Sequence, residues 1–402
     1  MPFLVIGNVA SGKLNLKETR FVSEDYYSSL NSFRIPQFRD VLFTVTGSYG
    51  ISLLVDTEKP FCVQRHIAII KQPFLDSCFL AKSLSSGYVH RLCDETATGI
   101  AQKTVGLQSL RRFLIPVPPL AEQRRIVAAL DEYLGLVDSV EADEAALEEL
   151  AAKARAKVLD LAIRGKLVEQ DPADEPASEL LARVHAEKLA MVERGELKPK
   201  DVAGDSVIWR GEDNSYYEKV GEDAVNRIDS ISFVLPETWT WCRLGAICLP
   251  QGRRLPSGPS FNYIDIDSID NVRHVVRSFK TLATADAPSR AVRALRSGDT
   301  VFSMVRPYLE NIAYIDDNLA DCIASSGFFV CSPASSDIHP TWLFNLLLSS
   351  YAIQSVNKHM RGDNSPSVRK DDMEKLLLPL PPFNEQQRIC NRLATLLPEL
   401  EI

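Results

Sequence analysis

The sequence IPVPPLAEQRRIV at residues 115–127 returns 263 residues later as LPLPPFNEQQRIC at residues 378–390. Seven positions are identical in the two stretches: Pro116, Pro118, Pro119, Glu122, Gln123, Arg125 and Ile126 recur as Pro379, Pro381, Pro382, Glu385, Gln386, Arg388 and Ile389. Self-similarity at a fixed interval is the mark of a duplicated structural unit. The chain is therefore expected to contain two copies of one unit.

The repeat extends upstream of these stretches, at offsets that drift from 263 to 259 residues. The matching positions and segments are Gly99 with Gly362, Val105 with Val368, DVLFTVTGSYG (40–50) with DTVFSMVRPYL (299–309), and FLVIGNV (3–9) with YIDIDSI (263–269). Loop insertions produce such a drift. Each copy is expected to be a β-rich globular part followed by a proline-rich entry into a helix.

The globular parts contain hairpin signals. VLFTVT (41–46) and GISLLV (50–55) are apolar, β-branched runs around a Gly-Ser-Tyr-Gly turn, which predicts two paired strands. Residues 300–305 and 311–315 repeat the pattern, and helical patches follow near residues 74–90 and 341–358. An α+β fold class follows from this mixture.

A long helix is predicted after Pro118 and Pro119, because proline is tolerated in the first turn of a helix. Its apolar positions follow a heptad pattern to about Ile163, with Glu144 as the exception: Leu130, Tyr133, Val137, Val140, Glu144, Leu147, Ala151, Ala154, Val158 and Leu161. This pattern favours a coiled coil, and the alternative is one amphipathic helix lying on a globular core. Gly165 and Pro172 end the helix, and a second helical piece (177–197) and a polar linker (198–205) follow.

The composition of the 402 residues narrows the class of protein. No run of 18 apolar residues is present, so no membrane span is expected. Eight scattered cysteines without a CxxC pair indicate reduced thiols in a cytoplasmic protein rather than a zinc site. The net charge of −8 is uneven, since residues 1–115 hold 13 Lys and Arg against 9 Asp and Glu, whereas residues 116–206 hold 12 against 20.

The repeated Pro-Pro motif, followed by a long helix ending in LDLAIRGKLVEQDP (159–172), resembles the conserved region of specificity subunits of type I restriction-modification systems. LPETWTWCRLG (235–245) resembles the opening of a target-recognition domain of that family. DVLFTVTGSYGISLLV (40–55) resembles the hairpin inside such a domain. The resemblance covers nearly the whole chain, and the order of the duplicated motifs makes it specific.

The resemblance implies two β-rich target-recognition domains, at residues 1–115 and 207–378, that each read one half of a split double-stranded DNA site. Long helices would join them as an antiparallel coiled coil. The conserved regions, at residues 116–200 and 379–402, would dock two methyltransferase subunits, which in turn recruit restriction subunits. The implied docking residues are Pro118, Pro119, Glu122, Gln123, Arg125, Pro381, Pro382, Glu385, Gln386 and Arg388. The chain itself would have no catalytic site and no cofactor.

Two departures from the family pattern are visible. The first unit lacks a counterpart of residues 235–260, and the second repeat stops at Ile402, with Pro398 inside what should be helix. The chain is thus expected to be clipped at both ends relative to the family. A fragment, a product of gene rearrangement and a short natural variant are the alternatives.

Residues that read bases are usually Arg, Lys, Asn, Gln, Ser or Thr on loops. On this basis the predicted DNA contacts of the first unit are Lys13, Thr46, Ser48, Tyr49, Gln102 and Lys103. Those of the second unit are Arg253, Arg254, Arg306, Tyr308, Arg361, Ser367, Arg369 and Lys370. The alternative at each position is a solvated surface charge or a turn residue, and for Tyr49 and Tyr308 a place in the core.

Other functions are disfavoured by missing motifs. Ser11-Gly12-Lys13 lacks the leading glycine of a phosphate-binding loop, and no Asn/Asp-Pro-Pro-Tyr/Phe tetrapeptide of an amino-methyltransferase is present. Asp265, Asp267 and Asp270 form an acidic cluster that is either a solvated strand end or a nuclease metal site. A stand-alone nuclease or methyltransferase therefore remains one alternative. The other is a coiled-coil scaffold or half-specificity chain with lost or partial DNA binding.

Overall fold

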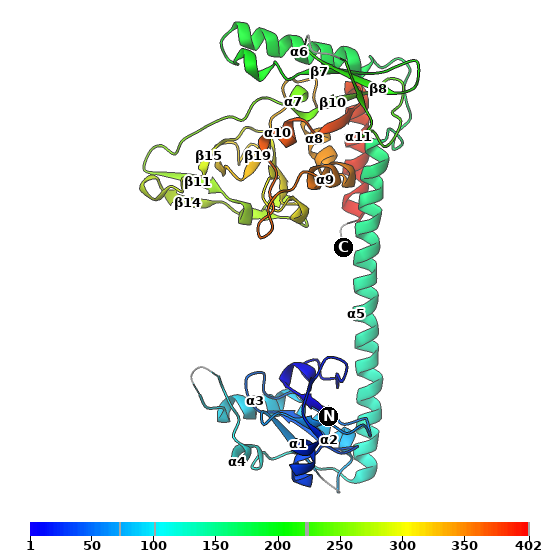
Figure 1. Cartoon of the computed structure of the whole chain (residues 1–402), viewed down its shortest axis with the longest axis vertical. Coiled ribbons are helices and arrows are strands. Elements are labelled where there is room, and N and C mark those ends of the chain that lie inside the picture. Colours follow the sequence, from blue (N-terminus) through cyan, green and yellow to red (C-terminus); the bar gives the residue numbers. More distant parts are fainter. Residues whose placement is uncertain (72–73, 100–101, 222–224, 401–402) are drawn as a thin grey trace. The chain divides into compact units, whose positions relative to one another are not determined.

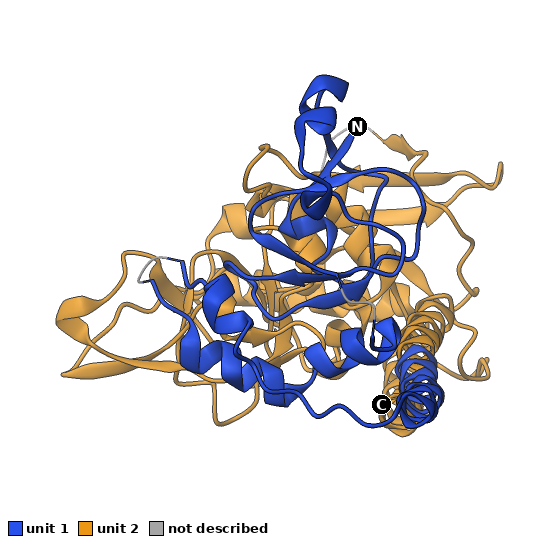
Figure 2. Cartoon of the chain, turned by 90° about the horizontal axis from the view of Figure 1, so that it is seen from below, with its two compact units in different colours: residues 1–144 blue, residues 145–402 orange. Residues whose placement is uncertain are grey.

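The computed structural model describes residues 1–71, 74–99, 102–221 and 225–400. It divides into two compact units, Met1–Glu144 and Ala145–Ile402 (Figures 1 and 2). The boundary falls inside one long helix. The predicted division into four segments, at residues 1–115, 116–200, 207–378 and 379–402, stays a prediction.

The first unit contains two three-stranded sheets. One has the strand order β2-β1-β5 and the other β4-β3-β6. Their strands are β1 (Pro2–Leu4), β2 (Arg20–Phe21), β3 (Val41–Thr44), β4 (Ser52–Leu54), β5 (Cys62–Val63) and β6 (Ile67–Ile70). Strands β3 and β4 form the hairpin predicted from residues 41–55, since Val41 pairs with Leu54 in antiparallel register.

Short helices complete the first unit. They are α1 (Glu24–Ser29), α2 (Ser77–Leu84), α3 (Gly87–Thr96) and α4 (Leu107–Leu110), with 3-10 turns η1 (Ile6–Asn8) and η2 (Ser32–Arg34). The helical patch predicted near residues 74–90 is therefore two helices. The break follows from N-caps, because the side chains of Asp76 and Ser86 each accept hydrogen bonds from backbone N–H groups one turn on.

Helix α5 (Leu120–Ile163) has 44 residues and confirms the long helix predicted after the two prolines. It ends before Gly165, whose φ of +65° suits a helix C-terminus. Between Leu130 and Leu150 its apolar side chains are exposed. The predicted coiled-coil pairing of this stretch stays a prediction.

The second unit repeats both sheets of the first. A four-stranded sheet has the order β14-β11-β18-β15, and a three-stranded sheet has the order β17-β16-β19. The strands are β11 (Ser260–Ile264), β14 (Lys280–Ala283), β15 (Ala291–Ala294), β16 (Thr300–Ser303), β17 (Ile312–Tyr314), β18 (Ile323–Ser325) and β19 (Phe328–Cys331). A two-stranded ribbon, β12 (Ile269–Asp270) and β13 (Val275–Val276), and the turns η4 (Ile266–Ser268), η5 (Thr284–Asp286) and η6 (Pro307–Leu309) lie between them.

The strand registers confirm the internal repeat. Phe3 pairs in parallel with Cys62, and its counterpart Tyr263 pairs in parallel with Ile323. The hairpin of β16 and β17 pairs Thr300 with Tyr314, as β3 and β4 pair Val41 with Leu54. Two copies of one β-rich unit, as the sequence predicts, are therefore present.

The second unit also has elements without a counterpart in the first. These are α6 (Ala177–Glu193), η3 (Pro199–Asp201), the sheet of β7 (Ser206–Arg210), β8 (Tyr216–Val220) and β9 (Asn226–Ile228), then β10 (Thr240–Arg243) and α7 (Leu244–Ile247). Helix α6 confirms the second helical piece expected at residues 177–197. The three-stranded β7-β8-β9 sheet was not predicted.

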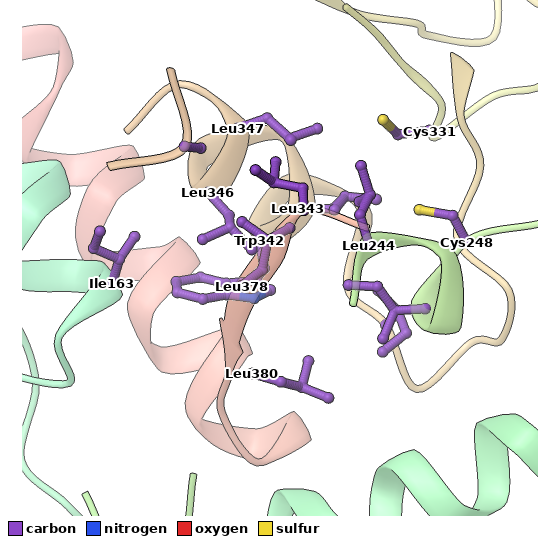
Figure 3. Packing of buried hydrophobic residues seen from close by; sticks show 14 of the residues in the cluster. Ile163, Leu244, Cys248, Cys331, Trp342, Leu343, Leu346, Leu347, Leu378 and Leu380 are labelled. Carbon is purple, nitrogen blue, oxygen red and sulfur yellow. The ribbon is translucent and has the colours of Figure 1, made fainter. Parts of the chain in front are cut away.

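The remaining elements of the second unit are α8 (Pro340–Leu347), α9 (Ser350–Asn357), α10 (Lys370–Glu374), β20 (Leu377–Leu380), α11 (Phe383–Leu396) and η7 (Pro398–Leu400). Trp342 and Leu346 of α8, Leu378 of β20 and Leu244 of α7 meet Ile163 in one buried cluster (Figure 3). The end of α5 therefore packs into the core of the second unit.

Candidate nucleic-acid interface

In each unit, two loops far apart in the sequence meet at the end of the central hairpin. In the first unit Thr46 and Thr98 both form backbone bridges with Thr104. In the second unit Val305 and Arg361 both form bridges with Ser367. We call residues 46–50 with 98–104, and residues 305–310 with 361–367, the loop pairs of the two units; residues 100–101 lie outside the described residues.

The first loop pair brings four of the six predicted contact residues together. Ser48, Tyr49, Gln102 and Lys103 line one open hollow of about 420 Å³, together with His90 of α3. Ser48, Gln102 and Lys103 are exposed. Hydroxyl, amide and ammonium groups converging on one concave surface match the donors and acceptors that read base edges.

Tyr49 lines this hollow and is half-buried, with its ring packed against the apolar core of the first unit. Its hydroxyl donates a hydrogen bond to Asp94 of α3 at 2.8 Å, and its ring centroid lies 6.0 Å from that of His90. The hydrogen bond from Tyr49 lowers the pKa of the Asp94 carboxyl, and the same bond raises the pKa of the Tyr49 phenol. Asp94 therefore stays ionised and fixes the phenol ring.

The other two predicted residues of the first unit lie elsewhere. Thr46 is buried and its hydroxyl accepts a hydrogen bond from Thr104 at 3.2 Å, so it closes the loop pair from inside instead of facing DNA. Lys13 is exposed on the separate turn that follows η1.

The second loop pair contains Arg306, Tyr308, Arg361 and Ser367. The backbone N–H of Arg306 donates to the Pro366 carbonyl at 2.7 Å, and its guanidinium donates to the Asn364 carbonyl at 3.2 Å. Arg306 and Tyr308 are exposed. Both hydrogen bonds join the loops through main-chain carbonyl groups of the second loop. The side chains of Arg306 and Tyr308 remain at the surface.

Arg306 has an unusual backbone for its residue type. Its φ of +48° lies in the left-handed region, where the matching position of the first unit holds a glycine, Gly47, at +70°. A non-glycine residue there costs about 1–2 kcal/mol. Such strain in a loop is a common sign of a functional constraint.

Arg361 of the second loop pair and Lys370 beside it form ion pairs, and Arg369 lies between them in the sequence. Arg361 lies 3.2 Å from Asp372, and Lys370 lies 2.9 Å from Glu374. Arg369 is exposed at the start of α10. The cationic groups of Arg361, Arg369 and Lys370 are exposed. Arg361 and Lys370 each have an acidic neighbour, but exposed ion pairs are weak. Arg369 occupies the N-cap position of α10.

Arg253 and Arg254 are not part of the loop pair. Arg253 forms a backbone bridge with Arg293 of β15, and Arg254 donates from its backbone to the Val292 carbonyl at 3.0 Å. Both lie along the outer edge of the four-stranded sheet.

The repeated Gln of the Pro-Pro motif has the same internal role in both units. Gln123 accepts a hydrogen bond from the backbone N–H of Asp76 at 2.8 Å and donates to the Pro118 carbonyl at 2.8 Å. Gln386 accepts from the backbone N–H of His339 at 2.8 Å and donates to the Pro381 carbonyl at 3.0 Å. Both amides are buried, so they tie the motif to the loop before α2 or α8 and offer no surface to a partner subunit.

The repeated Glu and Arg differ between the units. Glu385 is buried and accepts a hydrogen bond from the indole N–H of Trp239 at 2.8 Å, and burial raises its pKa. Arg388 pairs with Asp174 at 2.6 Å, and this hydrogen bond lowers the pKa of the Asp174 carboxyl. Glu122 and Arg125, their counterparts, are exposed. The docking prediction thus rests on the exposed members, Pro119, Glu122 and Arg125, because Pro381 and Pro382 are also buried.

The acidic cluster contains three separately paired carboxylates. Asp265, Asp267 and Asp270 lie 2.7, 2.7 and 3.4 Å from Arg290, Lys280 and Arg277 respectively. In the described parts of the chain, no group of three His, Cys, Asp or Glu side chains is arranged to hold a metal ion. Across the same residues, every helix is too short or too polar to cross a membrane.

Sequence reasoning missed His90 and Asp94, which support the first loop pair from α3. Their spacing of four residues places them on one face of a helix, which was the available signal. It could not be connected to Tyr49, because the contact spans 45 residues.

The family described as "Type I restriction modification DNA specificity domain" matches residues 1–149 and 291–402, which together make up more than half of the chain. The chain belongs to this family. The two matched ranges contain both loop pairs of the specificity domain and both copies of the Pro-Pro motif.

Curated relatives within the family are distant. The chain is 26% identical over 387 residues to the type I restriction enzyme EcoAI specificity subunit of Escherichia coli, with 83% of this chain and 61% of that protein covered. It is also 26% identical over 251 residues to the EcoEI specificity subunit of Escherichia coli, with 61% and 39% covered. The chain thus spans less than two thirds of the length of these relatives.

Two solved structures are similar in part. The HsdS subunit from Thermoanaerobacter tengcongensis is 38% identical, with a TM-score of 0.39 and coverage of 42% of this chain and 44% of that one. The type I restriction-modification S subunit from M. genitalium is 16% identical, with a TM-score of 0.38 and coverage of 97% and 81%.

Proposed function

We propose that this chain binds double-stranded DNA in a sequence-specific manner, as the specificity component of a type I restriction-modification complex. The observation that carries the proposal is the duplicated loop pair, which presents exposed polar and cationic side chains at the same place in both units. Two loop pairs on one chain, each of which contacts one DNA segment, would recognise a site with two separate halves.

The long helix supports a spacing role. At 1.5 Å per residue, its 44 residues extend about 66 Å. At about 3.4 Å per base pair this length is on the order of two turns of DNA. We propose that the length of α5 is matched to a run of unread bases between the halves of the site.

The chain acts, in this proposal, without a catalytic site, a metal or a cofactor of its own, in the cytoplasm. Methyl transfer and cleavage belong to methyltransferase and restriction subunits, and the exposed residues Pro119, Glu122 and Arg125 contribute to docking a methyltransferase subunit. The EcoAI and EcoEI relatives, named as specificity subunits of type I restriction enzymes, support this division of labour.

The test is co-expression with a type I methyltransferase subunit from the same genome, followed by mapping of methylated adenines on host DNA. A split motif with two defined halves is the expected result. Arg306→Ala should relax or abolish the half read by the second unit, and Gln102→Ala with Lys103→Ala the half read by the first. The matched control is Arg210→Ala, an exposed arginine of β7 that is outside the loop pairs and not among the predicted DNA contacts, which should leave the motif unchanged.

A scaffold or half-specificity chain is the competing function. The exposed apolar positions of α5 favour it, because they offer a surface to another helix. A complex that forms without methylating DNA would support this second function and contradict the first.

A further inference from the structure

A two-stranded ribbon in the second unit carries an exposed arginine in its turn. Strands β12 and β13 pair in antiparallel register, and residues 271–274 form the turn between them. The carboxylate of Asp270 accepts hydrogen bonds from the backbone N–H groups of Val272 at 3.1 Å and of Arg273 at 3.0 Å. We call residues 269–276 the ribbon. Its turn is held in one backbone conformation, and Arg273 is exposed on it.

The ribbon is attached to the second loop pair. The side-chain amide of Asn271 donates a hydrogen bond to the carbonyl of Leu309 at 2.8 Å. Strand β13 packs beside β17, and the ring of His274 lies against the backbone of Glu310. Leu309 and Glu310 belong to the same loop as Arg306. The ribbon therefore lies beside a loop that we propose to contact DNA bases.

Backbone strain is concentrated where the ribbon and this loop meet. Among the described residues, five that are not glycine have a positive φ. Three of them, His274, Arg306 and Glu310, belong to the ribbon and the loop, with φ values of +56°, +48° and +55°. Residues with such a backbone persist only where the surrounding contacts fix them, and they cluster at sites that bind ligands. The ribbon and the loop thus form one constrained surface.

The ribbon is locally cationic in an acidic chain. The segment from β12 to the start of β14 contains two Arg and one Lys against one Asp, whereas the net charge of the chain is −8. Arg277 lies 3.4 Å from Asp270, and Lys280 lies 2.7 Å from Asp267. With the residues that the structure describes, the guanidinium of Arg273 forms no ion pair and no hydrogen bond. Arg273 is therefore the cation of this segment that is left for an external anion.

A cation occupies the same place in the first unit. Lys13 lies five residues after Asn8, the last residue of η1, and Arg273 lies five residues after Ser268, the last residue of η4. These two turns follow the matching strands β1 and β11. Lysine and arginine have different shapes but the same charge, and charge is the property that a contact with phosphate requires.

We propose that Arg273 binds a backbone phosphate of the DNA, beside the bases that the second loop pair contacts. This inference rests on the proposed function and adds a contact that does not depend on base sequence. Bases exposed in the major groove lie between two rows of phosphates, and the groove is only about 12 Å wide. A ribbon attached to a loop that reaches these bases therefore lies near one row of phosphates.

The contact orients the second unit on the duplex. A guanidinium group donates two parallel hydrogen bonds to a phosphate. Contacts of this kind fix the register and orientation of a protein on DNA, whereas contacts with base edges carry the sequence information. Arg273 and Arg306 thus have separate roles, although their loops are joined. Arg273 is a positioning residue, and Arg306 distinguishes bases.

The test measures binding of the full chain, in complex with a type I methyltransferase subunit from the same genome, to two labelled duplexes. One duplex contains the mapped site, and the other has the same length and a scrambled sequence. Arg273→Ala should weaken binding to both by a similar factor of about ten, the size of a hydrogen bond to a charged group. It should also reduce the slope of binding against salt concentration by about one. Arg273→Lys should keep the slope of the parent, because lysine still neutralises a phosphate.

Arg210→Ala is the matched control, since Arg210 is an exposed arginine of β7 outside the ribbon and both loop pairs. It should bind both duplexes as the parent does. An unchanged affinity and salt slope in Arg273→Ala would overturn the inference and leave the proposed function intact. A loss confined to the mapped site would also overturn it, because Arg273 would then read bases. A parent complex that binds neither duplex would contradict the proposed function, and this inference with it.

Discussion

Arg306 combines a strained backbone with an exposed side chain, and its counterpart Gly47 has neither. Arg306→Gly removes a left-handed backbone strain of about 1–2 kcal/mol, which stabilises the folded chain. Glycine also gives the unfolded chain more conformational freedom, and this offsets about 0.5–1 kcal/mol of that gain. We expect the free energy of unfolding in urea to be unchanged or slightly higher, while affinity for DNA falls about tenfold. Stability and binding would thus move in different directions, as expected for a residue retained for function.

The control for this change is Gly47→Ala. It imposes the same backbone strain on the first unit without providing a long side chain, so it should lower stability by about 1 kcal/mol. A parallel loss of stability and DNA affinity in Arg306→Gly would indicate that Arg306 is structural.

Asp299 makes folding pH-dependent. Burial raises its pKa from the ordinary 3.8 to about 6. Between these values the folded chain holds a proton that the unfolded chain has lost, so stability falls as pH rises from about 4 to about 6. The full difference of about two pKa units corresponds to no more than about 3 kcal/mol.

Asp299→Asn should flatten this dependence, measured as the free energy of unfolding in urea at several pH values from 4 to 7. The exposed Asp363→Asn should leave the profile of the parent chain unchanged. A steep fall with rising pH that persists in Asp299→Asn would assign the dependence to another group.

At the scale of elements, the middle of helix α5 is exposed, whereas its C-terminal end is buried. Val137 and Val140 are 51% and 65% exposed, whereas Leu159 is 5% exposed in the core of the second unit. Val137→Asp and Val140→Asp should each change the free energy of unfolding by no more than about 0.5 kcal/mol. Leu159→Asp should cost more than about 3 kcal/mol, because it buries an unpaired carboxylate.

Denaturant unfolding of the three variants at two protein concentrations checks this expectation. A large, concentration-dependent loss in Val137→Asp would mean that another helix covers the apolar positions in solution. That outcome would favour a coiled coil with a helix of a second molecule, which differs from the predicted pairing of long helices that join the two domains.

The elements predicted correctly are those whose signals are local. The hairpin at β3 and β4 follows from apolar, β-branched runs around a glycine turn, and α5 from the Pro-Pro start and the heptad pattern. Strands β7, β8 and β9 were missed because charged and polar residues, as in Tyr216–Val220, interrupt the apolar pattern of a sheet that is only partly buried. Their stability depends on packing over Trp241, which the sequence does not reveal.

The candidate interface was predictable only in its parts. Ser48 and Lys103 were identified by residue type, but their meeting requires the bridge between Thr46 and Thr104, 58 residues apart. The burial of Thr46 and of Gln386 was not predicted, because polar residues are buried where hydrogen-bond partners exist, and those partners come from distant segments.

At the scale of the whole molecule, the net charge of −8 makes general attraction to DNA weak, so affinity must come from a few local cations. If four phosphates are neutralised, the logarithm of the binding constant should fall with that of salt concentration at a slope of about −3.6. Lys103→Ala should reduce the slope by about one.

Titration of a labelled duplex containing the mapped site at several salt concentrations gives this slope. The exposed Lys59, which lies outside both loop pairs, provides the control in Lys59→Ala. Binding that does not vary with salt would contradict phosphate contacts and support the scaffold function.

The paired glutamines of the Pro-Pro motif also have a kinetic consequence. Gln123 closes a chain segment of 47 residues by bonding Asp76, and Gln386 closes one of 47 residues by bonding His339. The entropy lost on closing a loop depends on its length, so the two closures are equally costly. The lengths of the two closed segments are equal, so they cannot cause a difference in refolding rate between the units. Such a difference would therefore arise from the amino-acid sequences within the segments.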